Sequence, residues 1–107
     1  MTTWRLATLE EVKSILQQEF QHLHPKHRKC FASIQVQPRQ VPVTNNPGES
    51  VWVIAEKDGN ALYWSDAEEG WELEALQEGG VLQKRGCNQF ALQHILFQLF
   101  GDPELLP

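Results

Sequence analysis

The chain has 107 residues, of which 41% are hydrophobic and 21% are charged, with a formal net charge of −5 at pH 7. These values predict one globular domain over residues 1–107 and exclude a disordered chain. No apolar run approaches membrane-spanning length, and the N-terminus lacks the apolar segment of a secretory signal, so we expect a cytoplasmic protein with no membrane partner.

The charge is divided unevenly along the chain. Residues 1–40 hold six basic and three acidic residues, whereas residues 41–107 hold three basic and eleven acidic residues. An acidic surface repels nucleic acid and attracts cationic proteins. We therefore expect a basic protein partner and no nucleic-acid partner.

The first element in chain order is a helix from Leu9 to Leu23. Thr8 and Glu11 form the capping-box pattern at its start, and apolar residues then recur at helical spacing. Pro25 is expected to end the helix, because the residue before a proline is disfavoured in the α conformation. The basic segment His24–Lys29 is then expected to be a connector.

Alternation of apolar and polar residues predicts a half-buried strand over Cys30–Gln37. Pro38 and Pro42 cannot donate to a ladder, so an extended segment through Val41 and Val43 would have to lie at a sheet edge. The segment Asn45–Gly48 is typical of a turn.

Two strands are expected at Ser50–Glu56 and Ala61–Ser65, joined as a hairpin by the Asp58-Gly59 turn. The segment Trp71–Leu76 fits a third strand or a short helix, and alternation favours the strand. The glycine pair at 79–80 ends it, and Val81–Gln83 is expected to add a further short strand.

The last element is predicted as a helix over Phe90–Phe100, with Asn88 as its N-cap and Gly101 at the C′ position. Apolar residues surround it almost completely, so this helix is either central to the core or carries a second face for a partner. The tail Glu104–Pro107 is expected to be loose. The whole pattern is α-β-β-β-β-α, an α+β fold in which an antiparallel sheet of three to five strands is packed by an N-terminal and a C-terminal helix.

Residues suited to metal binding or catalysis have simpler interpretations. His22, His24, His27 and Cys30 are chemically competent zinc ligands, but no second cluster completes a familiar module. Cys87 and His94 would lie about 10 Å apart on one helix, too far for proton transfer. Cys30 and Cys87 form no C-x-x-C motif and are expected to be reduced. We expect no catalytic residues, no metal and no cofactor.

Aromatic and acidic residues are concentrated between residues 51 and 75. Strand alternation places some of the aromatic residues away from the core face, and aromatic anchors ringed by charge are typical of binding hot spots. The competing interpretation is that the helices cover these aromatic residues. The predicted partner-binding residues are Trp52, Asp58, Tyr63, Trp64, Asp66, Glu68, Glu69, Trp71, Glu72 and Glu74.

Three short stretches, Glu49–Ile54, Asp58–Asn60 and Tyr63–Asp66, resemble hairpins of bacterial immunity proteins of polymorphic toxin systems. The resemblance implies a non-enzymatic protein that binds a cognate basic toxin, often a nuclease, and covers its active site. The alternative function is an acidic secretion or assembly chaperone that dimerises through Phe90–Phe100. A third hypothesis is an enzyme or metal-binding domain that uses the His/Cys segment. The oligomeric state is open between monomer and homodimer.

Overall fold

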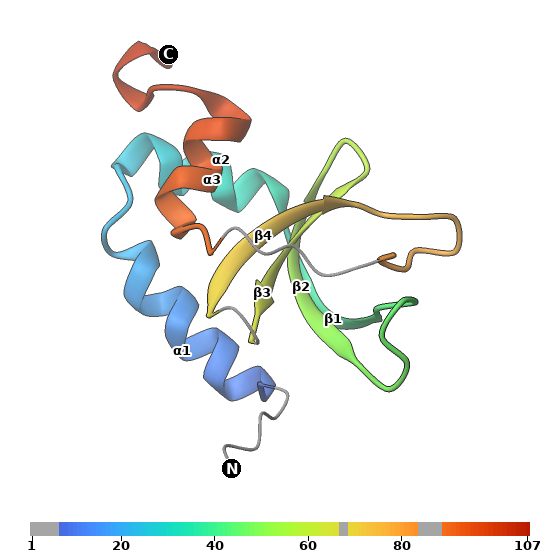
Figure 1. Ribbon diagram of the computed structural model, residues 1–107. Coiled ribbons are helices and arrows are strands. Elements are labelled where there is room, and N and C mark those ends of the chain that lie inside the picture. Colours follow the sequence, from blue (N-terminus) through green and yellow to red (C-terminus); the bar gives the residue numbers. More distant parts are fainter. Residues whose placement is uncertain (1–6, 67–68, 84–88) are drawn as a thin grey trace.

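The computed structural model describes residues 7–66, 69–83 and 89–107 (Figure 1). It confirms the α+β class, with a four-stranded antiparallel sheet between N-terminal and C-terminal helices, and it adds one helix that the sequence did not predict. In chain order the elements are α1 (Leu9–Phe20), α2 (Pro25–Ile34), β1 (Gln35–Pro42), β2 (Ser50–Lys57), β3 (Asn60–Ser65), β4 (Gly70–Ala75), α3 (Leu92–Phe100) and the 3₁₀ turn η1 (Pro103–Leu105).

The predicted capping box begins α1. The Thr8 side chain accepts from the Glu11 amide at 3.2 Å, and the Glu11 carboxylate accepts from the Thr8 amide at 3.3 Å. The helix ends at Phe20, three residues before the predicted end. Arg28 donates to the carbonyls of Phe20 and Gln21, so its guanidinium satisfies carbonyl groups that a helix end leaves without partners.

The expected connector and most of the expected strand over Cys30–Gln37 are wrong, because residues 25–34 form α2. Pro25 begins this helix at its first position, where a proline loses no hydrogen bond. The His24 side chain caps it by accepting from the Lys26 amide at 3.1 Å. His27 and Phe31 are buried on one side of α2 with helical spacing, and this spacing outweighs the alternation of the same residues.

The sheet has the order β1-β2-β3-β4, and every neighbouring pair is antiparallel. The predicted hairpin is confirmed: Lys57 pairs with Asn60, and Asp58 and Gly59 have φ values of 53° and 83°. Two consecutive positive φ angles are those of a type I′ turn. The first strand β1 contains both Pro38 and Pro42 and lies at the sheet edge, as the prolines require.

The favoured strand at Trp71–Leu76 is confirmed as β4, one residue earlier at each end. The expected strand Val81–Gln83 is reduced to isolated bridges. One of them is parallel and joins Leu82 to Val43, with the Leu82 amide 3.1 Å from the Pro42 carbonyl oxygen. The segment that follows β4 therefore returns to the end of β1.

The C-terminal helix α3 begins at Leu92, two residues later than predicted, with Ala91 as its N-cap and no side-chain hydrogen bond from the cap residue. The predicted cap, Asn88, lies outside the described residues. Gly101 ends the helix with φ 82°, as expected. The predicted loose tail instead contains η1, and the Lys26 ammonium donates to the Leu106 carbonyl at 2.7 Å.

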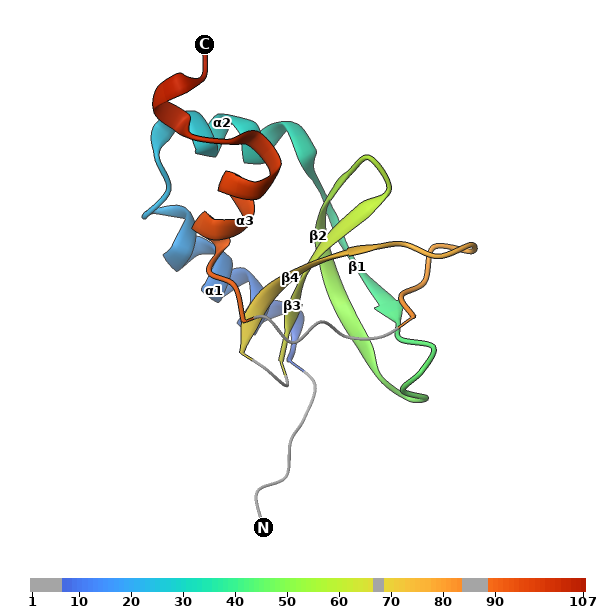
Figure 2. The same ribbon diagram turned by 45° about the horizontal axis from the view of Figure 1, so that its top comes forward.

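Both faces of the sheet bury apolar side chains. The three helices cover one face, where Ile54, Leu62 and Trp71 meet buried residues of α1, α2 and α3 (Figures 1 and 2). A smaller cluster on the other face includes Tyr63 and Leu82. Among the described residues, no helix is both long and apolar enough to cross a membrane.

Candidate functional site

The structure favours the helix-covered interpretation for the tryptophans. Trp52, Trp64 and Trp71 all pack against the main core beneath the helices. Trp71 is fully buried, whereas Trp52 and Trp64 are half-buried, and the rings of Trp64 and Trp71 meet edge to face at 5.2 Å. Most of the indole surface in this region therefore stabilises the fold.

Three of the predicted partner-binding residues have no exposed surface. Tyr63, Trp71 and Glu72 are each 0% exposed, so in this conformation they cannot contact a partner. Glu72, which the sequence analysis predicted as a partner-binding acid, instead accepts from the Gln89 amide at 3.0 Å. We correct the predicted surface by removing these three residues.

Glu19, which the sequence analysis placed in no site, organises the helix-covered core. One carboxylate oxygen accepts from the Trp71 indole N–H at 2.6 Å, and the other accepts from the Leu92 amide at 3.0 Å. The second bond supplies the N-terminal cap that Ala91 lacks. Glu19 thus links α1, β4 and α3 at one point.

The remaining predicted residues lie at opposite ends of the sheet. Asp58 is in the β2–β3 turn, and Glu74 pairs with Ala61 close to that end. Asp66 and Glu69 belong to the β3–β4 turn at the other end, about 17 Å away by the rise of β3. Glu68 lies outside the described residues. The remaining predicted residues therefore form two groups, because successive turns of an antiparallel sheet lie at opposite ends of its strands.

One end retains both aromatic and acidic residues, and we call it the acidic aromatic end. The backbone of Ala7 connects two residues of this end. The Ala7 amide donates to Asp66 at 2.7 Å, and the Ala7 carbonyl accepts from the Trp52 indole at 3.3 Å. The first turn of α1 follows Ala7 directly and contains two further acids, Glu10 and Glu11. The residues of this end are Trp52, Trp64, Asp66, Glu69, Glu10 and Glu11.

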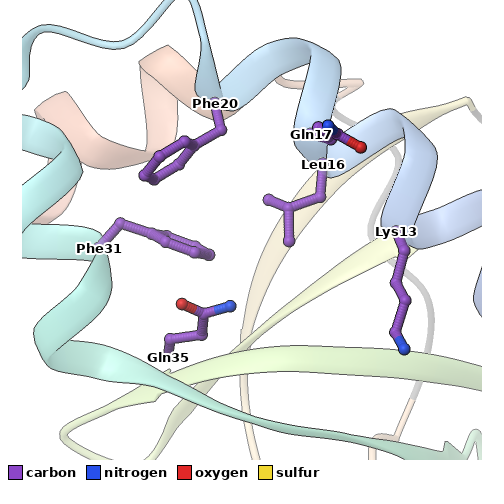
Figure 3. A pocket seen from close by; sticks show the side chains of 6 residues that line it. All are labelled: Lys13, Leu16, Gln17, Phe20, Phe31 and Gln35. Atoms are coloured by element: carbon purple, nitrogen blue, oxygen red, sulfur yellow. The ribbon is translucent and has the colours of Figure 1, made fainter.

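A groove of about 230 Å³ lies between α1 and α2 (Figure 3). The rings of Phe20 and Phe31 meet edge to face at a centroid distance of 5.9 Å, and Leu16 completes the apolar wall. Lys13 and two glutamines line the rest. The described residues that line the groove include no carboxylate, so they do not match the basic partner that the composition predicts.

The histidines take part in local structure. His24 caps α2, and the Nε2 atom of the buried His27 lies 2.8 Å from the Gly101 carbonyl oxygen. Among the described residues, which include His22, His24, His27 and Cys30, no group of three or more such side chains is placed to hold a metal ion. Cys87 lies outside the described residues, so its relation to His94 is not placed.

The apolar face of α3 is used within the domain. Leu92, Ile95 and Leu96 are fully buried in the core, and Phe97, 41% exposed, is the large apolar side chain that this helix leaves at the surface. The sequence hypothesis of a helix central to the core therefore describes α3 better than a helix with a second broad apolar face.

Comparison with protein-family models, with curated proteins and with solved structures finds no match to this chain.

Proposed function

We propose that this protein is a non-enzymatic binding protein of the immunity class, which binds a basic toxin through the acidic aromatic end. The observation that carries this proposal is the placement of Trp52 and Trp64, half-buried, beside the acids of two separate elements. Aromatic rings supply contact area that slows dissociation, and acids around them speed encounter with a cationic partner.

The packing of this end supports a preformed surface. Asp66 and Trp52 are both held by Ala7, and Trp64 rests edge-on against the buried Trp71. Side chains that are fixed before binding lose little entropy in the complex. We therefore expect association without rearrangement of the domain.

The chaperone alternative requires dimerisation through α3. The burial of Leu92, Ile95 and Leu96 inside the domain leaves this helix a small apolar surface, which favours the immunity interpretation over the chaperone. Sedimentation at micromolar concentration tests the difference. A monomer agrees with the proposal, and a stable dimer that Phe97→Asp dissociates would support the chaperone.

A charge-reversal pair tests the binding end. The immobilised protein is expected to capture a basic partner from a lysate of the native host at low salt, and mass spectrometry identifies this partner. Inhibition of the partner's toxic activity is then measured with the two purified proteins. Glu69→Lys should slow association about tenfold at low salt, because electrostatic steering controls the encounter. The control is Glu78→Lys, which makes the same charge change at an exposed site outside this end.

Two results would contradict the proposal. In one, Glu69→Lys and Glu78→Lys reduce the association rate equally, which would mean that only net charge matters. In the other, the captured partner keeps its full activity in the complex, which would refute the immunity function while leaving a binding function in place.

A further inference from the structure

Three side chains at the start of α2 hold the segment that follows α3, and we call this contact the C-terminal clasp. The members His24, Lys26 and His27 contact Glu104, Leu106 and Gly101 at distances of 3.2, 2.7 and 2.8 Å, respectively. In Figures 1 and 2, the C-terminal turn lies beside α2 at one end of the molecule, and the beginning of α1 lies at the other. The clasp is therefore separate from the acidic aromatic end and can be tested independently of the proposed function.

His27 is the buried member of the clasp, with 0% of its surface exposed. Because a carbonyl only accepts, the Nε2 atom that meets the Gly101 oxygen carries the hydrogen. The Nδ1 atom of the neutral ring is then an acceptor, and within the described part of the chain it has no hydrogen-bond partner. The Phe97 ring packs edge to face against the imidazole, with the two centroids 4.9 Å apart. The closed clasp therefore holds a ring with one nitrogen bonded and the other without a partner.

Protonation of His27 would be costly in the closed clasp. It would turn Nδ1 from an acceptor into a second donor, with no acceptor placed for it among the described residues. The ring would also carry a charge that water does not reach. The start of α2 adds to the cost, because a helix N-terminus is partly positive and α2 contains three lysine or arginine residues and no acid. The closed clasp therefore favours the neutral ring.

Three groups near His27 act in the opposite direction. Asp102 and Glu104 line one pocket together with His27 and attract a positive charge. Both carboxylates are exposed, so water and salt screen this attraction. The carbonyl end of α3 also favours a charged ring, since Gly101 caps that helix, but its oxygen meets Nε2 and leaves Nδ1 without an acceptor. The cost of a buried N–H at Nδ1 therefore remains.

His22 and His24 are the other titratable groups at this place. His24 has two opposed responses to a proton. A hydrogen on its Nδ1 would end the bond from the Lys26 amide at 3.1 Å, whereas the added charge would strengthen the pair with Glu104. His22 is exposed to water. A pH response of the clasp therefore depends most on His27.

We propose that the C-terminal clasp is a pH-sensitive device, which is closed at neutral pH and opens when His27 takes up a proton below about pH 6.5. Opening hydrates the ring and gives the new N–H at Nδ1 a water acceptor. Since the open form binds one proton more than the closed form, the closed form gains stability as the pH rises through this range. Opening also frees residues 101–107 from α2 and uncovers Pro103, which is buried in the closed form.

NMR of the wild-type protein between about pH 7.5 and 5.5 tests the proposal, because histidines titrate in this window and most carboxylates titrate below it. The ring signals of His27 are compared with those of the exposed His22 and His94. We expect His27 to keep the signals of a neutral Nε2–H ring until the clasp opens. His22 and His94 should protonate without a change in the C-terminal segment.

The amides of Leu105 and Leu106 report the opening itself. In the closed clasp they donate to the carbonyls of Asp102 and Pro103. We expect their signals to shift towards those of a flexible peptide in step with protonation of His27. Signals that stay unchanged down to about pH 5.5, or that change while the His27 ring stays neutral, would overturn the proposal.

Urea unfolding at about pH 7.5 and 5.5 measures the same linkage with a matched pair of variants. The unfolding constant of the wild type should rise about tenfold on acidification, the limit for one proton taken up below about pH 6.5. His27→Gln keeps an N–H group for the Gly101 carbonyl and binds no proton, so it should remove most of this rise. His94→Gln, at an exposed site of α3, should keep it. Equal rises in the two variants would contradict the proposal, and the wild-type NMR titration decides the question if His27→Gln does not fold.

Discussion

Glu19 is the residue whose substitution tests the packing argument most directly. Glu19→Ala removes the acceptors of both the Trp71 indole and the Leu92 amide, whose bonds measure 2.6 Å and 3.0 Å. A hydrogen bond to a charged group contributes about 1.5 kcal/mol at the lower end, which suits a half-buried carboxylate. Two such bonds predict a loss of about 3 kcal/mol, a large share of the 5–15 kcal/mol that stabilises a typical domain.

Urea unfolding of three variants measures this effect. Glu19→Ala should lower the free energy of unfolding by about 3 kcal/mol, and Glu19→Gln by about 2 kcal/mol, because an amide offers one accepting oxygen in place of two. The control Gln18→Ala, at an exposed neighbouring position of α1, should stay within about 0.5 kcal/mol of wild type. The slope of the unfolding free energy against urea should not change, since the same surface is exposed.

NMR of the indole N–H of Trp71 reports the same bond without unfolding the protein. A short bond to a carboxylate deshields this proton, so Glu19→Gln should move its signal upfield. A loss below about 1 kcal/mol for Glu19→Ala, or wild-type stability of Glu19→Gln, would refute the inference that this carboxylate joins the three elements.

Two further predictions concern stability and are checked by thermal or urea unfolding. Gly70→Ala should destabilise the fold by about 2 kcal/mol or more, because a Cβ there would lie 2.7 Å from the carbonyl carbon of Gln89. Gly48→Ala meets open space and should cost about 1 kcal/mol because of its φ of 84°. Equal losses for the two variants would contradict the close approach at Gly70. Arg28→Ala should cost about 1–2 kcal/mol through the carbonyls at the end of α1, and Lys29→Ala should cost little; equal effects would show that the arginine does not stabilise this helix end.

Local signals in the sequence were sufficient for much of the fold. The Thr8–Glu11 capping box and the Asp58-Gly59 turn each depend on neighbouring residues, and both predicted elements form. The sheet edge at Pro38 also followed from a local property, the missing amide hydrogen. Helix α2 was missed because Pro25 was interpreted as a stop, although proline is equally suited to the first position of a helix.

The candidate site depended on long-range contacts that composition cannot reveal. Asp66 meets Ala7 across 59 positions in the sequence, and Glu72, which its burial removed from the site, meets Gln89 across 17. A carboxylate with such a partner looks the same in sequence as a solvated one. A signal that was available concerned α2: helical periodicity would have placed both His27 and Phe31 in the core.

The bridge between Leu82 and Val43 has a consequence for how partners can be recognised. It engages the end of β1 at Pro42, and both Pro42 and the mid-strand Pro38 lack an amide hydrogen. On the opposite outer strand Trp71 exchanges hydrogen bonds with Phe90. A partner that adds a strand to a sheet needs a continuous row of unpaired backbone groups. Both outer strands are interrupted in this way, which disfavours strand addition. We therefore expect the proposed binding to use side chains, so that surface substitutions should change its specificity without disturbing the sheet.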